Sequence, residues 1–475
     1  MPAPRHTPLP DAGHASTIGR ASVLLSMAAF TLLLIAGSSS IGMMDQGDYP
    51  RTVSRIVGEP LPASADAVPG APVTRWSLRG GLPRPNPSAG TPSFLFAGAA
   101  WVQSTYQDHF DLPQLALVAK FAWLACLGLL AVSLGRRRDV GPRGQALLAA
   151  VLVVASFASH NVAFLQSLYG EFSFLLGLPL LLAALLWPEG RTRALMLLAG
   201  LVLCGGAKTQ FFYLPLLVLA VVCLQARVSG IRAGAATLAA ILMAQLFCLA
   251  PLLVSDVLGF NRHHSTYLGS YLAMSADELD RLGLPPEERA CIGVDAWGNR
   301  LAAVQATRMT PGRQPCPGAR EKSFADTLRP YAVAPAAAVR LLAKGLPPHL
   351  TVDYFHVDRA NRYVVPLHPD RGPVAGWLRD LSTLRDAAIR PWVVVLLLVA
   401  ALATATASMR RQPAVASAVA LLALVFVSQV AVSLMGEGVR DLSKHLAGAQ
   451  YALDLLVVLM GATLLAGRRR TPAGA

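Results

Sequence analysis

Long apolar stretches separated by shorter polar connections dominate the hydropathy pattern of this chain. Ten of them approach or reach the length that a helix needs to cross the roughly 30 Å hydrocarbon core of a bilayer. They cover residues 21–38, 114–135, 145–164, 172–188, 194–207, 210–226, 233–255, 391–409, 413–435 and 447–467. The pattern therefore predicts an all-α, polytopic transmembrane bundle of about ten helices.

One pair of these segments allows two interpretations. The stretches 194–207 and 210–226 are separated by very few residues, and Gly205, Gly206 and Lys208 lie at the break. They form either a tight helical hairpin or one broken, re-entrant element. We adopt the hairpin because it keeps the number of spans even.

Arginines mark alternate connections between the predicted spans. They are Arg136, Arg137, Arg138, Arg143, Arg191, Arg193, Arg227, Arg232, Arg410, Arg411, Arg468, Arg469 and Arg470. Because basic residues concentrate in cytoplasmic loops, both termini are expected inside the cell and the protein in the inner (plasma) membrane. The long leader lacks a clear small-x-small cleavage site before Asp45, which favours an uncleaved first helix over a secretory signal.

Composition supports a lipid environment. The 475 residues are 54% hydrophobic and only 14% charged, which is too apolar for a soluble globule. The net charge of +14 would indicate a nucleic-acid partner in a soluble protein. Here the arginines flank apolar segments, so we expect membrane lipid and no nucleic acid as the partner.

The predicted sidedness leaves two long segments outside the cytoplasm. The chain then divides into an N-terminal transmembrane module at 1–255 with a first extracytoplasmic loop at 39–113, a large extracytoplasmic segment at 256–390, and C-terminal helices at 391–475. Within the first loop, the Pro/Gly/Ser-rich stretch Glu59–Ser93 predicts irregular chain, followed by a helix near 96–107. The 256–390 segment predicts short helices joined by Pro-containing loops.

The cysteines agree with this sidedness. Four of the six, Cys126, Cys204, Cys223 and Cys248, lie in apolar spans, where a thiol behaves as a small buried hydrophobe. The other two, Cys291 and Cys316, lie in the predicted outer segment. An oxidising compartment permits a disulfide between them, and we predict that bond.

Two carboxylates directly follow the first apolar run. Asp45 and Asp48 are expected at the outer mouth of the bundle, where partial desolvation and mutual repulsion raise the pKa of a carboxylate and make it a useful general base. The alternative is a solvated pair at a helix end, neutralised by Arg51 and Arg55. A divalent metal is compatible with the pair but is not required.

A second polar group lies between the third and fourth spans, in the sequence SLYGE. Glu171 is either an acid favoured by the helix N-terminus or, with Tyr169, a contact for sugar hydroxyls. A third group lies in AKTQ. Lys208 is one of only five lysines, and beside Gln210 it suits a phosphate, although a lysine that snorkels to the interface is the alternative.

A fourth polar group precedes the last span. If the chain is helical from Val439, then Asp441, Lys444 and His445 share a face. Asp454 lies farther along, about two turns into the predicted membrane. An acid at that depth must face protein or water, so it is expected to be structural or functional.

Four short patterns, read in order, resemble a known family. They are DQGDYPR at 45–51, SLYGE at 167–171, AKTQ at 207–210 and DLSKHL at 441–446. Together with the many spans and the large outer loop they are similar to the integral-membrane C-type glycosyltransferase superfamily, and within it to the WsfD-type hexose transferases of bacterial surface-glycan synthesis. The resemblance implies an inverting hexosyl transfer from a polyprenyl-phosphate donor to a glycan or lipid-linked acceptor on the outer face.

The resemblance also implies roles for individual residues. The base is Asp45 or Asp48, the donor phosphate binds at Lys208, Arg440, Lys444 and His445, and Tyr169, Glu171 and Gln210 contact the sugar or the acceptor. One position departs from the family pattern, because Gly170 stands where the family usually has Ser or Thr. No organic cofactor is implied, since P-loop, Rossmann and zinc signatures are absent from the sequence.

Other functions share parts of this pattern. A flippase or transporter of lipid-linked glycans also needs charged residues in a bundle, and Asp454 favours that interpretation. A polymerase of the O-antigen type shares the large outer loop, and a non-catalytic scaffold needs no particular acid. The polar groups lie at the outer boundary of the predicted bundle and no two-half repeat is evident, which favours the transferase.

Overall fold

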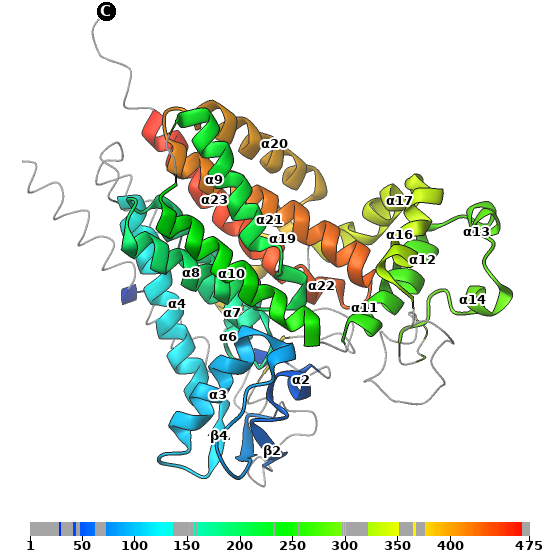
Figure 1. Cartoon of the computed structure of the whole chain (residues 1–475), viewed down its shortest axis with the longest axis horizontal. Coiled ribbons are helices and arrows are strands. Elements are labelled where there is room, and N and C mark those ends of the chain that lie inside the picture. The colour runs from blue at the N-terminus through cyan, green and yellow to red at the C-terminus, as the bar shows by residue number, and fades with distance from the viewer. Residues whose placement is uncertain are drawn as a thin grey trace, which may run out of the picture.

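Apolar helices form the body of the protein in a computed structural model (Figure 1). The structure describes residues 28–29, 41–43, 48–61, 73–135, 152, 155–156, 159–230, 233–254, 257–296, 298, 300, 322–350, 364–366 and 376–467. The helices of the body are α4 Leu112–Gly135, α6 Ser159–Leu165, α7 Glu171–Leu186, α8 Arg191–Gly205, α9 Leu214–Ser229, α10 Ala235–Val254, α20 Pro391–Ser408, α21 Pro413–Glu437 and α23 Ala447–Gly467. The expectation of a mostly helical chain is confirmed.

Five helices among the described residues are long and apolar enough to cross a membrane: α4, α9 together with the turn Thr209–Phe211 before it, α10, α20 and α21. Helix α7 and the described apolar part of α23 are shorter. These helices indicate a membrane protein. The count of ten spans and the orientation of the termini stay predictions, and the stretch 21–38 lies almost wholly outside the described residues.

Residues 194–226 form two separate helices, α8 and α9. The start of α8 and the end of α9 carry basic residues, and each lies near the end of a neighbouring helix. Glu189, in the turn before α8, accepts hydrogen bonds from the backbone of Gly234 and the hydroxyl of Thr237 before and within α10. Ser417 near the start of α21 donates to Gln225 near the end of α9. The connections that carry Arg191, Arg227 and Arg411 therefore gather at one end of the bundle.

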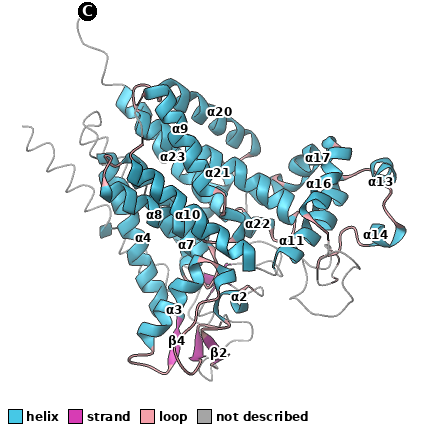
Figure 2. Cartoon of the chain, in the orientation of Figure 1, coloured by secondary structure: helices cyan, strands magenta, loops and turns pink. Residues whose placement is uncertain are grey.

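Residues of the predicted first loop form a small β-sheet (Figure 2). Strands β2 Val57–Pro60, β3 Arg75–Leu78 and β4 His109–Asp111 form an antiparallel sheet in the order β2-β3-β4, next to α2 Tyr49–Val53, the turn η1 Pro87–Ala89 and α3 Thr91–Gln103. Trp76 on β3 packs against Phe110 on β4, with 6.1 Å between ring centroids. The prediction of irregular chain at Glu59–Ser93 was wrong at the end of β2, at β3, at η1 and at the start of α3. The helix expected near 96–107 is present as α3.

A helical lobe follows α10 and lies apart from the sheet (Figure 1). It contains α11 Val257–Ser265, the π-turn η3 Thr266–Ser270, α12 Tyr271–Ala273, α13 Ala276–Leu282, α14 Pro286–Ala290, α16 Phe324–Val333, α17 Pro335–Gly345 and α18 Pro347–Leu350. Short helices were expected here. The strand β5 Val364–Pro366 was not, and it pairs antiparallel with β1 Ile41–Met43. Helix α19 Gly376–Ala388 then leads into α20.

Among the described cysteines, four are free and one takes part in a disulfide. Cys291 takes part in a disulfide, and its predicted partner Cys316 lies outside the described residues. Cys204 and Cys248 are free and buried, as expected for small apolar groups. Cys223 also lies in an apolar span, as expected, but is exposed on the surface of α9.

Candidate functional site

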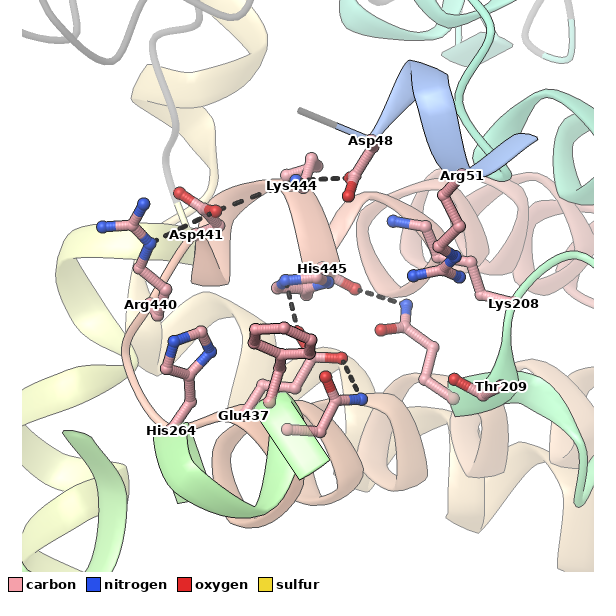
Figure 3. A pocket seen from close by; sticks show the side chains of 13 residues that line it. Asp48, Arg51, Lys208, Thr209, His264, Glu437, Arg440, Asp441, Lys444 and His445 are labelled. Carbon is pink, nitrogen blue, oxygen red and sulfur yellow. Dashed lines mark hydrogen bonds and ion pairs between the residues drawn. The ribbon is translucent and has the colours of Figure 1, made fainter. Parts of the chain in front are cut away.

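A polar cavity of about 280 Å³ opens at the end of the bundle opposite the basic turns. Figure 3 shows the side chains that line it. It lies where α8 and α21 end and where α2, α9 and α22 Leu442–His445 begin. Its lining residues are Asp48, Arg51, Lys208, Thr209, Gln210, Phe260, Asn261, His264, Glu437, Arg440, Asp441, Lys444 and His445. The structure thus brings residues of the first, third and fourth sequence motifs to one wall.

Helix α2 holds the first motif at the cavity. The Thr52 hydroxyl donates a hydrogen bond to the Leu168 carbonyl at 2.8 Å, and the Asn86 amide donates to the Arg51 carbonyl at 2.8 Å. The Tyr49 ring also packs on the Tyr169 ring, with 5.2 Å between centroids. These contacts place Asp48, which directly precedes α2, over the second motif.

The second motif supports the third from behind. Lys208 Nζ donates to Glu171 Oε1 at 2.5 Å, and both side chains are buried. Tyr169 is fully buried, and its ring centroid lies 6.0 Å from Lys208 Nζ and 5.2 Å from Lys444 Nζ. Neither Tyr169 nor Glu171 is on the cavity wall, so the structure does not place them as sugar contacts. They hold two ammonium groups in position.

The backbone around Gly170 leaves no room for a side chain. A Cβ atom at this position would lie 2.4 Å from the Ala207 carbonyl oxygen and 2.7 Å from Lys208 Cγ. The backbone of the second motif therefore touches the third motif directly, and only glycine leaves room for the lysine stem. A Ser or Thr here would displace Lys208.

Gln210 joins the third motif to the fourth. Its amide nitrogen donates to the Gln429 side chain at 3.4 Å and to the His445 carbonyl at 3.3 Å. Gln210 also lines the cavity, and its Oε1 atom is buried without a hydrogen-bond partner in the described part of the chain. It is therefore the predicted sugar or acceptor contact that reaches the wall.

The fourth motif is less helical than expected. Helix α21 ends at Glu437, and α22 begins only at Leu442. Between them Gly438 has a φ of +65°, and a Cβ there would lie 2.5 Å from the Leu268 carbonyl, so the turn requires glycine. The backbone of Asp441 adopts the left-handed conformation, with a φ of +48°. The predicted helix from Val439 was wrong, because this loop reverses tightly against η3.

Asp441 lies between two cations. Its Oδ2 atom is 3.8 Å from Lys444 Nζ and 3.5 Å from Arg440 Nε. Burial alone would raise the pKa of Asp441, but the attraction of Lys444 and Arg440 outweighs it and lowers the pKa to about 2. Arg440 also forms an ion pair with Asp295 at 3.0 Å, which ties the helical lobe to the cavity.

The site contains two imidazole rings, His445 beside a carboxylate and His264 near an arginine. His445 Nε2 lies 2.5 Å from Glu437 Oε2, and the Asn261 amide donates to Glu437 Oε1 at 3.2 Å. His264 accepts a hydrogen bond from the Ala296 backbone at Nε2. Burial, with Arg440 nearby, lowers the pKa of His264 to about 3, so this ring is neutral.

Asp48 does not have the raised pKa that the sequence suggested. Lys444 Nζ donates to its Oδ2 atom at 2.8 Å. Burial would raise the pKa, but Lys444, Lys208 and Arg51 together lower it well below the ordinary value. A carboxylate so neutralised is a weak base, which corrects the expectation. Asp45 lies outside the described residues.

Asp454 has a structural partner away from the cavity. Its two carboxylate oxygens accept from Arg385 Nε at 2.9 Å and Nη2 at 3.0 Å. Arg385 lies on α19, so the pair fastens this helix to α23. The residue that favoured transport in the sequence is thus accounted for by packing.

Several lining residues were not assigned roles from sequence. Glu437 lies shortly before the fourth motif, and its only signal in the sequence is that position. Arg51 was considered only as a neutralising partner of Asp45 and Asp48, not as a residue that lines a cavity. Asn261 and His264 lie on α11, which no motif marked. Among the described residues, no group of three or more His, Cys, Asp or Glu residues could hold a metal ion.

Comparisons with known proteins add one relative. The chain is similar to the uncharacterized protein YfdI of Escherichia coli K12. The two are 24% identical over 435 residues, which cover 91% of this chain and 93% of YfdI. No family model matches the chain, and no solved structure matches it. The similarity spans nearly the whole length of both proteins and carries no activity with it.

Proposed function

We propose that this chain is an inverting membrane glycosyltransferase that moves a hexose from a polyprenyl-phosphate donor to a cell-surface glycan or a lipid-linked acceptor. The observation that carries the proposal is the convergence of three motifs on one cavity, with the second motif directly behind it. These motifs come from distant parts of the chain and supply cations and carboxylates together.

The charges suit a phosphate leaving group. Lys208, Arg440 and Lys444 line the cavity and carry the positive charge that stabilises an anion as it departs. A phosphate needs little proton donation to leave, so a separate general acid is not required. The volume of about 280 Å³ is near the lower limit for ligand pockets and suits a head group rather than a lipid chain.

The place of the cavity agrees with an extracytoplasmic reaction. Helices α7 and α9 begin at the cavity and end at the basic turns, while α8 and α21 run the opposite way. If the basic turns face the cytoplasm, as positive charges in loops favour, the cavity faces the other side of the membrane. Lipid-phosphate sugars are the donors available there, whereas nucleotide sugars are cytoplasmic.

The test is transfer by purified protein. In detergent, the wild type should join the hexose of a polyprenyl-phosphate hexose to a lipid-linked acceptor, detected as a covalent product by mass spectrometry. Asp48→Asn should abolish the product, while Asp277→Asn, an exposed acid of α13, should not change it. Movement of a lipid-linked glycan across vesicles without a covalent product would instead support the transporter.

A further inference from the structure

Lys444 is a buried ammonium shared by two carboxylates. Its side chain is only 3% exposed, and its Nζ atom lies 2.8 Å from Asp48 and 3.8 Å from Asp441. A buried charge must keep a partner, because losing all of them costs several kcal/mol. Any anion that binds in this cavity therefore interacts with a lysine that is already paired.

The two partners of Lys444 are not equally fixed. Asp441 is held between Lys444 and Arg440, and its side chain is 14% exposed. Asp48 is 26% exposed and precedes a helix of only five residues. Of the two, Asp48 makes the shorter contact with Lys444 and is also the more exposed carboxylate, so an incoming anion that takes its place on Lys444 leaves it with access to water.

A further cation stands next to this pair. Arg51 lies one turn after Asp48 and lines the same cavity. Its Nε atom is buried without a hydrogen-bond partner, and no carboxylate of the described residues forms an ion pair with it. Its charge acts on Asp48, and because a guanidinium binds phosphate oxygens in a fixed fork, Arg51 offers hydrogen-bond donors to a phosphate in the cavity.

We infer that the phosphate of the ligand and the Asp48 carboxylate compete for Lys444, and that the phosphate displaces Asp48 by binding Lys444 and Arg51 together. This inference rests on the proposed function, since it assumes a phosphate ligand. It assigns Asp48 two states: a partner of Lys444, and a carboxylate released beside the bound phosphate. Lys208 stays with Glu171 in both.

The exchange makes Asp48 a better base at the moment when the donor is in place. Without Lys444 and next to a negative phosphate, the carboxylate binds a proton more strongly. It takes the proton from the acceptor hydroxyl as that oxygen forms a bond to the anomeric carbon. The bond from the anomeric carbon to the phosphate oxygen breaks, and its electron pair leaves on the phosphate. The proton stays on Asp48 until product release.

Binding of a short-chain (C10) isoprenyl phosphate to the full-length protein in detergent tests the competition. Asp48→Asn removes the competing charge, so it should bind the phosphate about tenfold more tightly than the wild type. Asp441→Asn removes a carboxylate near the same lysine but not its closest partner, so its gain should be smaller. Equal gains, or an unchanged or weaker affinity of Asp48→Asn, would overturn the inference.

Arg51→Gln gives a second arm that does not depend on the folding of the Asp48 variant. It should weaken binding about tenfold, whereas Arg281→Gln, an exposed arginine of α13, should leave it unchanged. Unchanged binding by Arg51→Gln would also overturn the inference. If the wild type binds no isoprenyl phosphate at all, the proposed lipid-phosphate donor fails, which is a different result.

Discussion

Lys444 Nζ donates a hydrogen bond to Asp48 Oδ2 at 2.8 Å, although 396 positions separate the two residues in sequence. This contact joins the first polar motif to the last. Around it the Tyr169 ring, the Lys208–Glu171 pair and Arg440 complete a cluster of charges at one end of the bundle. Some members of this cluster stabilise the fold, and we expect others to bind a ligand.

The Lys208–Glu171 pair should behave as a buried unit. Lys208→Met leaves the Glu171 carboxylate buried without its cation, and the expected loss of unfolding free energy is about 3–5 kcal/mol. Adding Glu171→Gln should restore much of that stability without restoring phosphate binding. Thermal unfolding in detergent measures the first effect and isoprenyl phosphate titration the second. A Lys208→Met protein as stable as the wild type would show that Lys208 and Glu171 do not form this buried ion pair.

Gly170 should tolerate no side chain. Gly170→Ala places a Cβ atom 2.4 Å from the Ala207 carbonyl oxygen, and the overpacking should destabilise the protein by about 1–3 kcal/mol and weaken phosphate binding through Lys208. Gly98→Ala on α3 is the matched control, because its added Cβ meets nothing within 4 Å. Equal melting temperatures and affinities for the two variants would contradict the close approach.

The Asp454–Arg385 pair should matter for stability rather than for a transport path. Asp454→Leu alone removes two hydrogen bonds from Arg385 and leaves it with the Asp386 carboxylate at 3.0 Å, so it should lower the unfolding free energy by about 1–3 kcal/mol. The double variant Asp454→Leu with Arg385→Leu should recover stability and retain glycosyl transfer. A stable double variant that has lost all activity would assign Asp454 a functional role.

The disulfide at Cys291 should steady the segment that reaches the cavity. Asp295 pairs with Arg440 and the Ala296 backbone donates to His264, both within a few residues of Cys291. Cys291→Ala or reductant should cost about 2–4 kcal/mol, seen as a lower melting temperature. Peptide mapping by mass spectrometry without reductant should find Cys291 joined to Cys316. Free thiols at both positions would refute the predicted pairing.

The sequence predicted the apolar helices well because their signal is local and long. Helices α4, α10 and α21 follow the expected ranges to within a few residues. The strands β3 and β4 were not predicted because each has only three or four residues, too few to show the alternation of apolar and polar residues that marks a strand. Their stability comes from cross-strand contacts such as that between Trp76 and Phe110.

The sequence predicted most of the charged residues of the candidate site, but not which of them form ion pairs with one another. The order of the helices predicts that Lys208 and Lys444 lie at the same end of the bundle, where both approach the Tyr169 ring. A linear sequence does not show which carboxylate pairs with each lysine. Asp48 was expected to have a raised pKa because its acidic neighbour Asp45 was weighed above the nearby Arg51, and the approach of the two lysines was not visible in sequence. Lys444 and Lys208 from two other motifs, together with Arg51 from its own motif, reverse the direction.

The most direct test of the central claim is the anomeric configuration of the product. Purified wild-type protein, given a polyprenyl-phosphate hexose and a lipid-linked acceptor in detergent, should form a glycoside whose configuration, read by NMR, is opposite to that of the donor. A retained configuration would contradict the inverting mechanism, and the absence of any glycoside would contradict the transferase itself.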